Sequence, residues 1–443
     1  MNNLFNKKFT ESKQTSHFDA LNIKLHDKRL RLCTELLHII FKDYKGRVSI
    51  RLWNDEVVIG SRAAVCTLVF NQPYSLSDLL LNRDLNRLAE AYLYGDVDAE
   101  GNLEMLFGLV EYLQNRFFTL AERLRIFLLA LKVASDGRKR GLISSDIGAE
   151  RNSNTKDSIA HHYDISNEFY RLFLDPEMVY SCAYFSGPEH SLAAAQCDKL
   201  DYICRKLRLV PGQKLLDIGC GWGGLSLWAA RNYGVNVHAI TLSQKQYSYA
   251  VARACDLKLD NRVNFELRDY RELPDSARYD RIVSVGMFEH IGTDNFPVYF
   301  NTVKRLLKSD GLFLNHGITN DTGWQRTPIT RFINNYIFPD GELARINEVI
   351  TAMEKAGFEI LDTEALRPHY VLTLRNWVSE LDKNRDKAID IAGEMIYKLW
   401  RLYMAGSVYY FNEGNTGVYQ ILACKQHQPW LLPLRRDDLY MFN

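Results

Sequence analysis

The sequence predicts an α/β fold, with a doubly wound sheet that follows a smaller N-terminal α+β domain. At 443 residues, the chain exceeds the usual size of a single domain. A polar stretch over residues 136–157 separates two regions of different pattern. After it, strand signals alternate with helical ones, which is typical of a parallel sheet covered by helices on both faces. We therefore expect domains over residues 1–135 and 158–443, joined by a linker.

The N-terminal region combines helical and alternating apolar spacing. Leu32 and Leu36 recur at helical spacing, whereas Val48, Ile50 and Leu52 alternate with polar neighbours. We expect a helix over 28–44, a hairpin of strands at 48–52 and 57–59, a third strand over 65–70, and mainly helices over 76–81, 85–94 and 103–131. The region contains no catalytic motif, so a scaffold, lipid presentation and dimer contact all remain open as its role.

The C-terminal region predicts the strands of the doubly wound sheet. We expect them over residues 214–218, 236–240, 262–266, 279–285 and 311–315, with further strands near 358–363 and 418–425. An aromatic insertion lies near 319–345 and contains Trp324, Phe332, Tyr336 and Phe338. An insertion of this composition could cover an apolar substrate bound at the sheet.

A glycine-rich turn follows the first of these strands. Leu215 and Ile218 suit a buried parallel strand, and helical spacing resumes at Leu225. The turn between them lacks side chains that would keep a ligand away from the backbone, because it contains Gly219, Gly221, Gly223 and Gly224. A strand, such a turn and a helix N-terminus together predict a nucleotide-sized slot with free backbone N–H donors.

Two cofactor classes fit this slot. The spacing of Gly219, Gly221 and Gly224 satisfies the dinucleotide pattern G-x-G-x-x-G. A dinucleotide site also needs an acidic residue at the end of the second strand, where this chain has Thr241 and then Leu242 and Ser243. The acid stands before the glycines, at Asp217, as in the Asp-x-Gly-x-Gly turn of methyltransferases that use S-adenosylmethionine (SAM). The sequence therefore favours SAM over a nicotinamide or flavin dinucleotide.

Further motifs carry a resemblance to a known family. They are His162-Tyr163-Asp164, Tyr180-Ser181-Cys182-Ala183-Tyr184-Phe185, the glycine turn, Thr241-Leu242-Ser243-Gln244-Lys245-Gln246, Gly286-Met287-Phe288-Glu289-His290-Ile291-Gly292 and Asn315-His316-Gly317-Ile318. From about His162 to its C-terminus, the chain resembles the cyclopropane-fatty-acyl-phospholipid synthases, which include the mycolic acid cyclopropane synthases. Several independent motifs in one order are far more specific than any one of them.

The resemblance implies which residues hold SAM. Gly219 and Gly221 let the backbone approach the methionine moiety, and Asp217 orients the turn. Tyr180 and Ser181 are expected to close over the methionine end. The complete set of expected cofactor residues is Tyr163, Tyr180, Ser181, Asp217, Gly219, Gly221, Thr241, Gln246, Tyr270 and Arg271, with Thr241 and Gln246 on the ribose and the last two near adenine.

The resemblance also implies an unusual base. Methyl transfer to an unactivated alkene leaves a carbocation, which must lose a proton before water reaches it. A strongly solvated carboxylate would fit badly in the apolar site that this requires. The family uses a bound bicarbonate ion instead, and five positions match its cradle: Cys182 and Ile318 through their backbones, Glu289, His316 and Tyr403.

Two other mechanisms use some of the same residues. Cys182 could be a covalent nucleophile, but an alkene is not electrophilic and needs no thiolate addition. Glu289, His290 and His316 could suggest a metal site, but the side chains of adjacent residues rarely converge on one ion. We therefore expect neither covalent nor metal catalysis.

The function that the sequence favours is the conversion of cis-unsaturated acyl chains of membrane phospholipids into cyclopropane chains. The same fold could make a branched methyl or methylene product, or methylate the nitrogen of a small molecule. A non-catalytic lipid-binding protein with a retained SAM slot is the alternative outside the enzymes. The bicarbonate cradle argues against the last two, because neither needs it.

Composition and charge restrict the setting of this activity. The net charge of +1 gives no case for attraction to nucleic acid. The eight cysteines include no Cys-x-x-Cys pair, and residues 1–13 have no apolar secretory core, so we expect reduced thiols and a cytoplasmic location. Apolar runs are too short to cross a bilayer, which leaves peripheral membrane contact. A homodimer is plausible from the resemblance.

Overall fold

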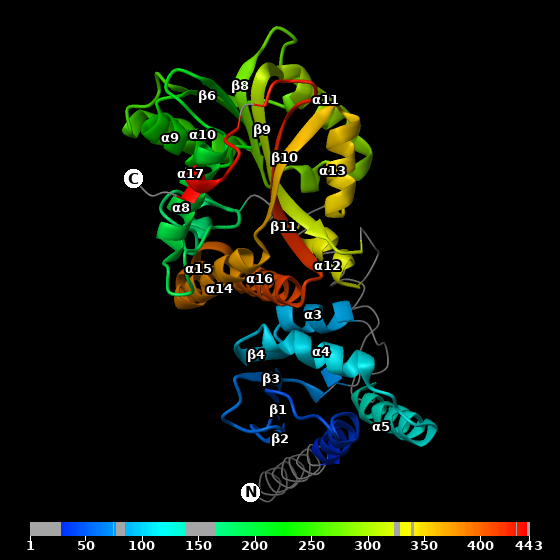
Figure 1. Cartoon of the computed structure of the whole chain (residues 1–443). Helices are drawn as coiled ribbons and strands as arrows, with labels where there is room; N and C mark the ends of the chain where they lie inside the picture. The colour runs from blue at the N-terminus through cyan, green and yellow to red at the C-terminus, as the bar shows by residue number, and fades with distance from the viewer. Residues whose placement is uncertain are drawn as a thin grey trace, which may run out of the picture. The chain divides into compact units, whose positions relative to one another are not determined.

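The computed structural model describes residues 28–73, 75–76, 85–138, 165–322, 328–337, 341–430 and 432–440. The chain forms two compact units, Met1–His161 and His162–Asn443. Most of the predicted linker lies outside the described residues, and so does Tyr163. Figure 1 shows the helices and strands of each unit.

The first unit contains a four-stranded sheet in the order β2-β1-β3-β4. Its strands are β1 (Val48–Leu52), β2 (Val57–Ile59), β3 (Cys66–Phe70) and β4 (Val97–Gly101). The predicted hairpin is confirmed, because β1 and β2 pair antiparallel. β3 lies parallel to β1, and β4, which the sequence analysis missed, pairs antiparallel with β3. Asp98, Glu100 and Gly101 are poor strand formers, so β4 gives only a weak signal in the sequence.

Helices cover this sheet and complete the core of the first unit. Residues 28–40 are helical and are followed later in the chain by α3 (Leu85–Leu93), α4 (Met105–Asn115) and α5 (Leu120–Arg138). The core contains Leu36 and Ile40 from the first helical segment, Ile50 from β1, and Leu129 and Val133 from α5. The predicted α+β character of the N-terminal region is therefore confirmed.

The second unit is built on a seven-stranded sheet in the order β10-β11-β9-β8-β5-β6-β7. Its strands are β5 (Lys214–Ile218), β6 (Asn236–Thr241), β7 (Val263–Leu267), β8 (Tyr279–Val285), β9 (Leu307–Asn320), β10 (Phe358–Ala365) and β11 (Thr416–Lys425). Each predicted strand is present, and β9 extends well beyond both ends of its predicted range. The doubly wound α/β fold is confirmed.

One strand departs from the predicted parallel order. β11 pairs antiparallel with both β9 and β10. Between β10 and β11 the chain forms α14 (Arg367–Lys383), α15 (Arg385–Ala392) and α16 (Glu394–Glu413), which the sequence analysis did not anticipate. These helices lie beyond the carboxyl ends of the strands instead of crossing a face of the sheet, so the returning strand runs in the opposite direction (Figure 1).

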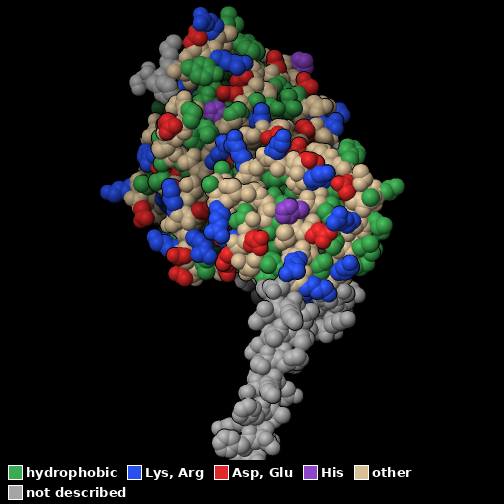
Figure 2. Space-filling view, turned by 90° about the horizontal axis from the view of Figure 1, so that it is seen from below, with side chains coloured by type: hydrophobic (Ala, Val, Ile, Leu, Met, Phe, Trp, Pro, Cys, Tyr) green, Lys and Arg blue, Asp and Glu red, His purple; other side chains and the backbone are tan. Residues whose placement is uncertain are grey.

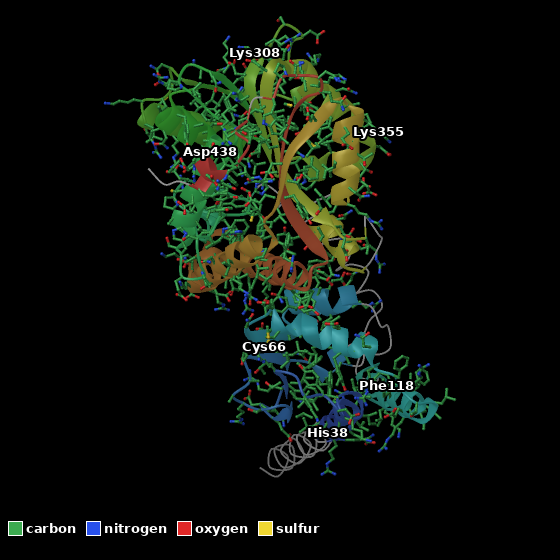
Figure 3. The ribbon with its side chains drawn as sticks, viewed as in Figure 1. His38, Cys66, Phe118, Lys308, Lys355 and Asp438 are labelled. Carbon is green, nitrogen blue, oxygen red and sulfur yellow. The ribbon has the colours of Figure 1, made fainter. Side chains whose placement is uncertain are left out.

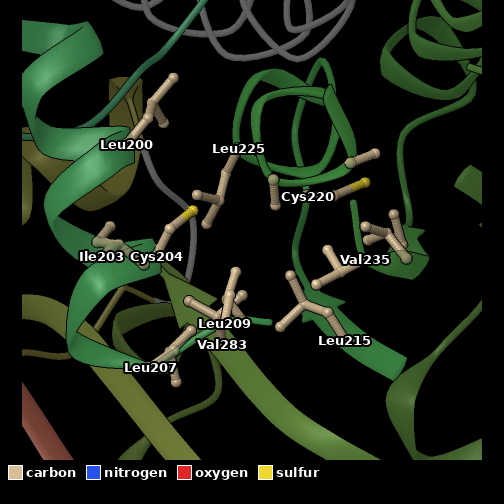
Figure 4. Packing of buried hydrophobic residues seen from close by; sticks show 14 of the residues in the cluster. Leu200, Ile203, Cys204, Leu207, Leu209, Leu215, Cys220, Leu225, Val235 and Val283 are labelled. Carbon is tan, nitrogen blue, oxygen red and sulfur yellow. The ribbon is translucent and has the colours of Figure 1, made fainter. Parts of the chain in front are cut away.

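Helices pack on both faces of this sheet. One face carries α8 (Leu192–Lys206), α9 (Gly224–Tyr233) and α10 (Gln244–Asp256), and its core is shown in Figure 4. The other carries α11 (Phe296–Leu306) and α13 (Ile346–Lys355). The shorter elements are α7 (Asn167–Tyr170), η1 (Tyr270–Glu272), η2 (Phe288–His290), η3 (Thr293–Asn295), α12 (Pro328–Tyr336) and α17 (Asp437–Tyr440). Within the described ranges, no helix has the length and apolar character needed to cross a membrane.

Candidate active site

The glycine turn lies at the carboxyl end of β5, where ligands bind in open α/β sheets. Gly219 and Gly221 have positive φ angles of 81° and 56°, which side chains disfavour. The N–H groups of Gly219 and Cys220 both donate to the carbonyl of Ile240 at 3.0 Å. The expectation of free N–H donors is therefore wrong for these two residues, because the turn uses them to fix itself to β6.

The glycines of the turn serve different purposes. A Cβ atom built on Gly221 would meet no protein atom within 4 Å, so this position faces open space. At Gly223 it would lie 2.7 Å from the Phe265 ring, and at Gly224 it would lie 2.7 Å from the carbonyl oxygen of Glu177. Gly221 therefore leaves room for a ligand, whereas Gly223 and Gly224 are required by packing within the protein.

Asp217 is buried directly beneath the turn. Its carboxylate accepts a hydrogen bond of 2.6 Å from the Ser226 hydroxyl on α9, which ties the end of β5 to the helix after the turn. Burial raises the pKa of Asp217 to about 6, opposed by the Ser226 hydrogen bond and by the nearby Lys199. The geometry agrees with a structural role in orienting the turn.

Lys199 is a buried cation that the sequence analysis missed. It lies on α8, and its Nζ donates to the Ser181 hydroxyl at 2.8 Å. Burial lowers the pKa of Lys199 to about 8, although Asp175, Cys182 and Asp217 oppose this shift. A lysine among the apolar positions of an amphipathic helix is the signal that could have identified it.

The predicted ribose residues are brought together at the end of β6. Thr241 Oγ1 donates to Gln246 Oε1 at 2.9 Å and accepts from the Ser243 N–H at 3.2 Å. The Ser243 hydroxyl in turn caps α10 by accepting from the Gln246 N–H. Helix capping thus places Gln246 one turn inside α10, next to Thr241.

Tyr180 and Ser181 lie on the segment before α8. The Tyr180 ring stacks on Trp377 of α14 at 5.0 Å, and its hydroxyl is hydrogen-bonded to that of Tyr403 on α16. Trp400 lies 5.8 Å from the same ring. Helices α14 and α16 therefore supply an aromatic wall opposite the carboxyl edge of the sheet.

Tyr270 and Arg271, predicted near adenine, are held by protein partners. The Tyr270 ring packs edge-on against Tyr299 at 5.4 Å and belongs to the core on the second face of the sheet. The Arg271 guanidinium donates to both carboxylate oxygens of Asp269, at 2.9 and 2.6 Å, and its side chain is largely exposed. Their contact with adenine stays a prediction.

Glu289 is a buried carboxyl group at the end of the loop after β8. Its Oε1 accepts from the Ile318 N–H at 2.8 Å. Its Oε2 is also buried, and no partner for it is found among the described residues. Burial raises the pKa of Glu289 to about 7, despite the opposing hydrogen bond from Ile318. The Ile318 N–H was predicted to donate to the anion, but in this structure it donates to Glu289. One N–H makes one good hydrogen bond, so this donor is already used.

His316 lies on the same face of β9 as Ile318, two residues earlier. Its Nδ1 lies 3.2 Å from the side-chain nitrogen of Gln420, its register partner on β11. Its Nε2 is buried without a partner within the described part of the chain. Burial, with help from Lys199 and Lys206, lowers the pKa of His316 well below its usual value, so the ring is neutral.

Cys182 and Tyr403 complete the five predicted cradle residues. Burial raises the pKa of Tyr403, and the nearby Glu289 adds to the shift; burial likewise raises the pKa of Tyr370 on α14, with Tyr403, Cys182 and Glu289 close enough to add to it. The structure therefore brings the predicted residues to one buried region. Burial also raises the pKa of the Cys182 thiol, which donates to the Ala183 carbonyl at 3.3 Å, and a protonated thiol is a poor nucleophile.

The aromatic insertion is described only in part. Trp324 and Phe338 lie outside the described residues. Phe332 and Tyr336 of α12 are nearly buried, with ring centroids 5.0 Å apart. A separate cleft of about 690 Å³ between α11 and α13 is lined by residues such as Thr293 and Glu342 but by none of the predicted site residues. The path of an acyl chain beneath the insertion stays a prediction.

Glu289 predicts a pH-dependent stability difference. Its folded pKa of about 7 exceeds its ordinary value of 4.5, so between these values the folded protein binds more protons than the unfolded chain. Its contribution to the free energy of unfolding is complete below pH 4.5 and is lost as pH rises to about 7. Glu289→Gln keeps the acceptor for Ile318 but removes this titration. Relative to wild type, the variant should gain stability over this window, by at most about 3 kcal/mol.

Urea unfolding of both proteins at several pH values measures this difference. Asp217 titrates in both proteins, so its contribution cancels. Equal pH slopes for wild type and variant would show that Glu289 is ionised in the folded protein and would contradict the assignment.

Comparisons with known proteins place this geometry in a family. Residues 150–421 match the family described as mycolic acid cyclopropane synthetase. A probable fatty acid methyltransferase from Pseudomonas putida is 36% identical over 401 residues, which cover 88% of this chain and 95% of that protein.

Two solved structures show the same relationship. The cyclopropane synthase MmaA2 from Mycobacterium tuberculosis aligns with a TM-score of 0.57 and 35% identity, over 61% of this chain and 98% of that one. The mycolic acid cyclopropane synthase CmaA1, complexed with S-adenosylhomocysteine (SAH) and CTAB, aligns with a TM-score of 0.56 and 34% identity over the same shares. The chain therefore belongs to the mycolic acid cyclopropane synthetase family of SAM-dependent methyltransferases.

Proposed function

We propose that this enzyme adds the methyl carbon of SAM to the cis double bond of an acyl chain in a membrane phospholipid and closes a cyclopropane ring. A bicarbonate ion bound by the cradle residues supplies the base. Family membership supports transfer from SAM to a lipid, because the curated relatives include cyclopropane mycolic acid synthases and probable fatty acid methyltransferases. The assignment of bicarbonate as the base is supported by residues of this chain.

The observation that carries the proposal is a pair of buried polar atoms without partners. Glu289 Oε2 and His316 Nε2 have none among the described residues, and both side chains are fixed by their other ends. Buried polar atoms are normally hydrogen-bonded, so such a pair calls for a small polar ligand. Bicarbonate fits, because it offers both acceptor oxygens and an O–H.

The hydrogen bonds of the two side chains assign their roles. With the Gln420 amide nitrogen donating to Nδ1, the neutral His316 ring carries its proton on Nε2, which is then a donor toward an anion. Glu289 keeps Oε2 for the O–H of the ion. Tyr403 lies close to Glu289 and is assigned as a further donor in the cradle.

The cofactor assignment rests on the turn and on Ser181. A lysine has donors only, so the Ser181 oxygen must accept from Lys199 Nζ. Its own O–H is then left to donate, as a carboxylate such as that of SAM requires. Gly221 leaves open space for the methionine end of SAM. Thr241 and Gln246 lie at the end of the neighbouring strand β6 and are assigned to the ribose.

A branched methyl or methylene product is the second candidate. It is favoured by the similarity to the probable fatty acid methyltransferase from Pseudomonas putida, which extends over 88% of this chain. Both products begin with methyl transfer to the same alkene. They differ in whether the first cation closes a ring or undergoes a hydride shift before it loses a proton.

Gly221→Val should abolish SAM binding without unfolding the protein. The new side chain would fill the space next to the turn, and its φ of 56° adds strain of about 1–2 kcal/mol. Gly212→Val is the matched control, because Gly212 also has a positive φ and open space but precedes β5 instead of following it. Calorimetry with SAM should show loss of binding for the first variant only. Equal affinities would remove the turn from the cofactor site.

Glu289→Gln and His316→Ala should bind SAM nearly as wild type does but turn over at least about a hundredfold more slowly, because each removes a ligand of the base. Glu359→Gln, at an exposed position on β10, is a control that should keep full activity. Turnover is measured with unsaturated phospholipid vesicles, with and without added bicarbonate. Parallel losses of SAM affinity and turnover would place both residues in the cofactor site.

SAM with a fully deuterated methyl group separates ring closure from a methyl branch. Ring closure must discard one deuteron and keep two, because the proton leaves from the transferred carbon. A methyl branch formed by a hydride shift and loss of a chain proton keeps all three. A methylene branch also keeps two, so the product from unlabelled SAM is examined by NMR, which should show ring protons and no vinylidene protons. We expect mass spectrometry of the fatty acids to show two deuterons, and retention of three would replace cyclopropane by a methyl branch.

A further inference from the structure

Helix α5 of the first unit carries a row of large apolar side chains on its surface. They are between 42% and 95% exposed and comprise Phe117, just before the helix, with Leu120, Leu124, Phe127, Leu128 and Leu131. Apart from the adjacent Phe127 and Leu128, they recur every three or four residues, which places the five within the helix on one side of it, over an arc of about 100°. We call these six residues the α5 stripe. An exposed stripe of this size is uncommon on a soluble protein and indicates an interaction surface.

The stripe is distinct from the face that holds α5 in place. Leu129, Ala130 and Val133 are buried, and Leu129 and Val133 belong to the core of the first unit. Phe118, labelled in Figure 3, also packs against this core, whereas its neighbour Phe117 faces away. The helix is therefore apolar on two sides, and packing within the unit explains only one of them.

Basic residues border the stripe on both sides. At 100° per residue, Arg123 falls beside one edge of the stripe, and Arg125 and Lys132 fall beside the other. All three are exposed, and Arg125 pairs with Glu35 at 2.6 Å. The acidic Glu122 lies on the opposite side of the helix. Figure 2 shows Lys and Arg side chains next to hydrophobic ones along its right-hand edge, the side on which Figure 1 draws α5.

This combination distinguishes between possible occupants. Helices that lie in a membrane interface have an apolar face bordered by Lys and Arg, which meet anionic headgroups. A symmetric dimer through the stripe would bring the basic borders of two copies together without acidic partners from the same stretch of helix. The charges therefore favour an anionic lipid surface over a second copy of this chain.

We infer that the α5 stripe docks the enzyme on the surface of an anionic phospholipid membrane. The inference rests on the proposed function for one point, that the substrate is a lipid in a bilayer. It assigns the N-terminal unit a role in lipid contact. The methyl transfer itself uses no residue of this unit. Phe117, Leu120 and Leu124 enter the headgroup region, while Arg123 and Lys132 contact phosphates.

The test uses the full chain and two variants. In the first, Leu120→Ser, Leu124→Ser and Leu131→Ser are combined; in the second, Arg123→Gln is combined with Lys132→Gln. Leu434→Ser, which changes a 95% exposed leucine in the other unit, is the control. Cosedimentation without SAM is measured with vesicles of phosphatidylglycerol and phosphatidylcholine in equal amounts, and with phosphatidylcholine alone.

The leucine variant should bind the mixed vesicles at least about tenfold more weakly. The charge variant should lose most of the preference for phosphatidylglycerol, whereas Leu434→Ser should bind as the parent does. SAM affinity should be unchanged in all variants, and an unchanged circular dichroism spectrum and melting temperature confirm that the first unit is folded. On vesicle substrates, the leucine variant should lose turnover in proportion to its lost binding.

Three outcomes would overturn the inference. Unchanged vesicle binding by the leucine variant would exclude a membrane contact. Conversion of a parent dimer to monomers with unchanged vesicle binding would identify a second copy as the occupant. A lower melting temperature with unchanged vesicle binding would show that another part of the chain covers the stripe. Because binding is measured without turnover, lost binding in a protein that makes no cyclopropane would support the stripe and reject the proposed reaction.

Discussion

The hydrogen bond from the Ile318 N–H to Glu289 is the interaction on which the candidate site depends. It joins the loop after β8 to the carboxyl end of β9, and the Glu289 side chain is buried there. A lone carboxylate is costly to bury, and one hydrogen bond does not remove that cost, as the raised pKa of Glu289 shows. The second carboxyl oxygen therefore requires a proton or a polar ligand.

Helices α14–α16 make this burial possible. In an open sheet, the carboxyl edge faces solvent unless something covers it, and here a segment of the chain does so before returning as β11. The aromatic residues Trp377, Trp400 and Tyr403 come from this segment and pack against or near Tyr180. An apolar, closed edge suits a reaction whose cation must be kept from water. It also explains why Lys199, His316 and Glu289 all have pKa values shifted toward their neutral forms.

The sequence could predict the parts of the site that depend on local signals. Strand β5, the turn at Gly221 and the carboxyl-edge positions of Glu289 and His316 follow from apolar runs, glycine spacing and topology. The partners of these residues could not be predicted in the same way. Gln420 meets His316 only because β11 runs antiparallel to β9, and that direction follows from helices beyond the sheet edge. Lys199 stands out only once the buried face of its helix is known. Gly223 can be recognised as a packing residue only when its spatial neighbour Phe265 is known.

The sheet also connects the predicted cradle residues to the glycine turn. His316 and Ile318 belong to β9, which pairs with β8, and β8 pairs with β5, from which the glycine turn emerges. Gly286 strengthens this link, because its N–H donates to the His316 carbonyl at 2.8 Å. The distance between the glycine turn and His316 is thus set by two neighbouring hydrogen-bonded ladders. Displacements of about 1 Å redirect reactivity, so choice among the protons of one carbocation demands such rigidity. In the proposed reaction, the ladder from β5 to β9 therefore contributes to the choice of product, and the aromatic wall limits access of water.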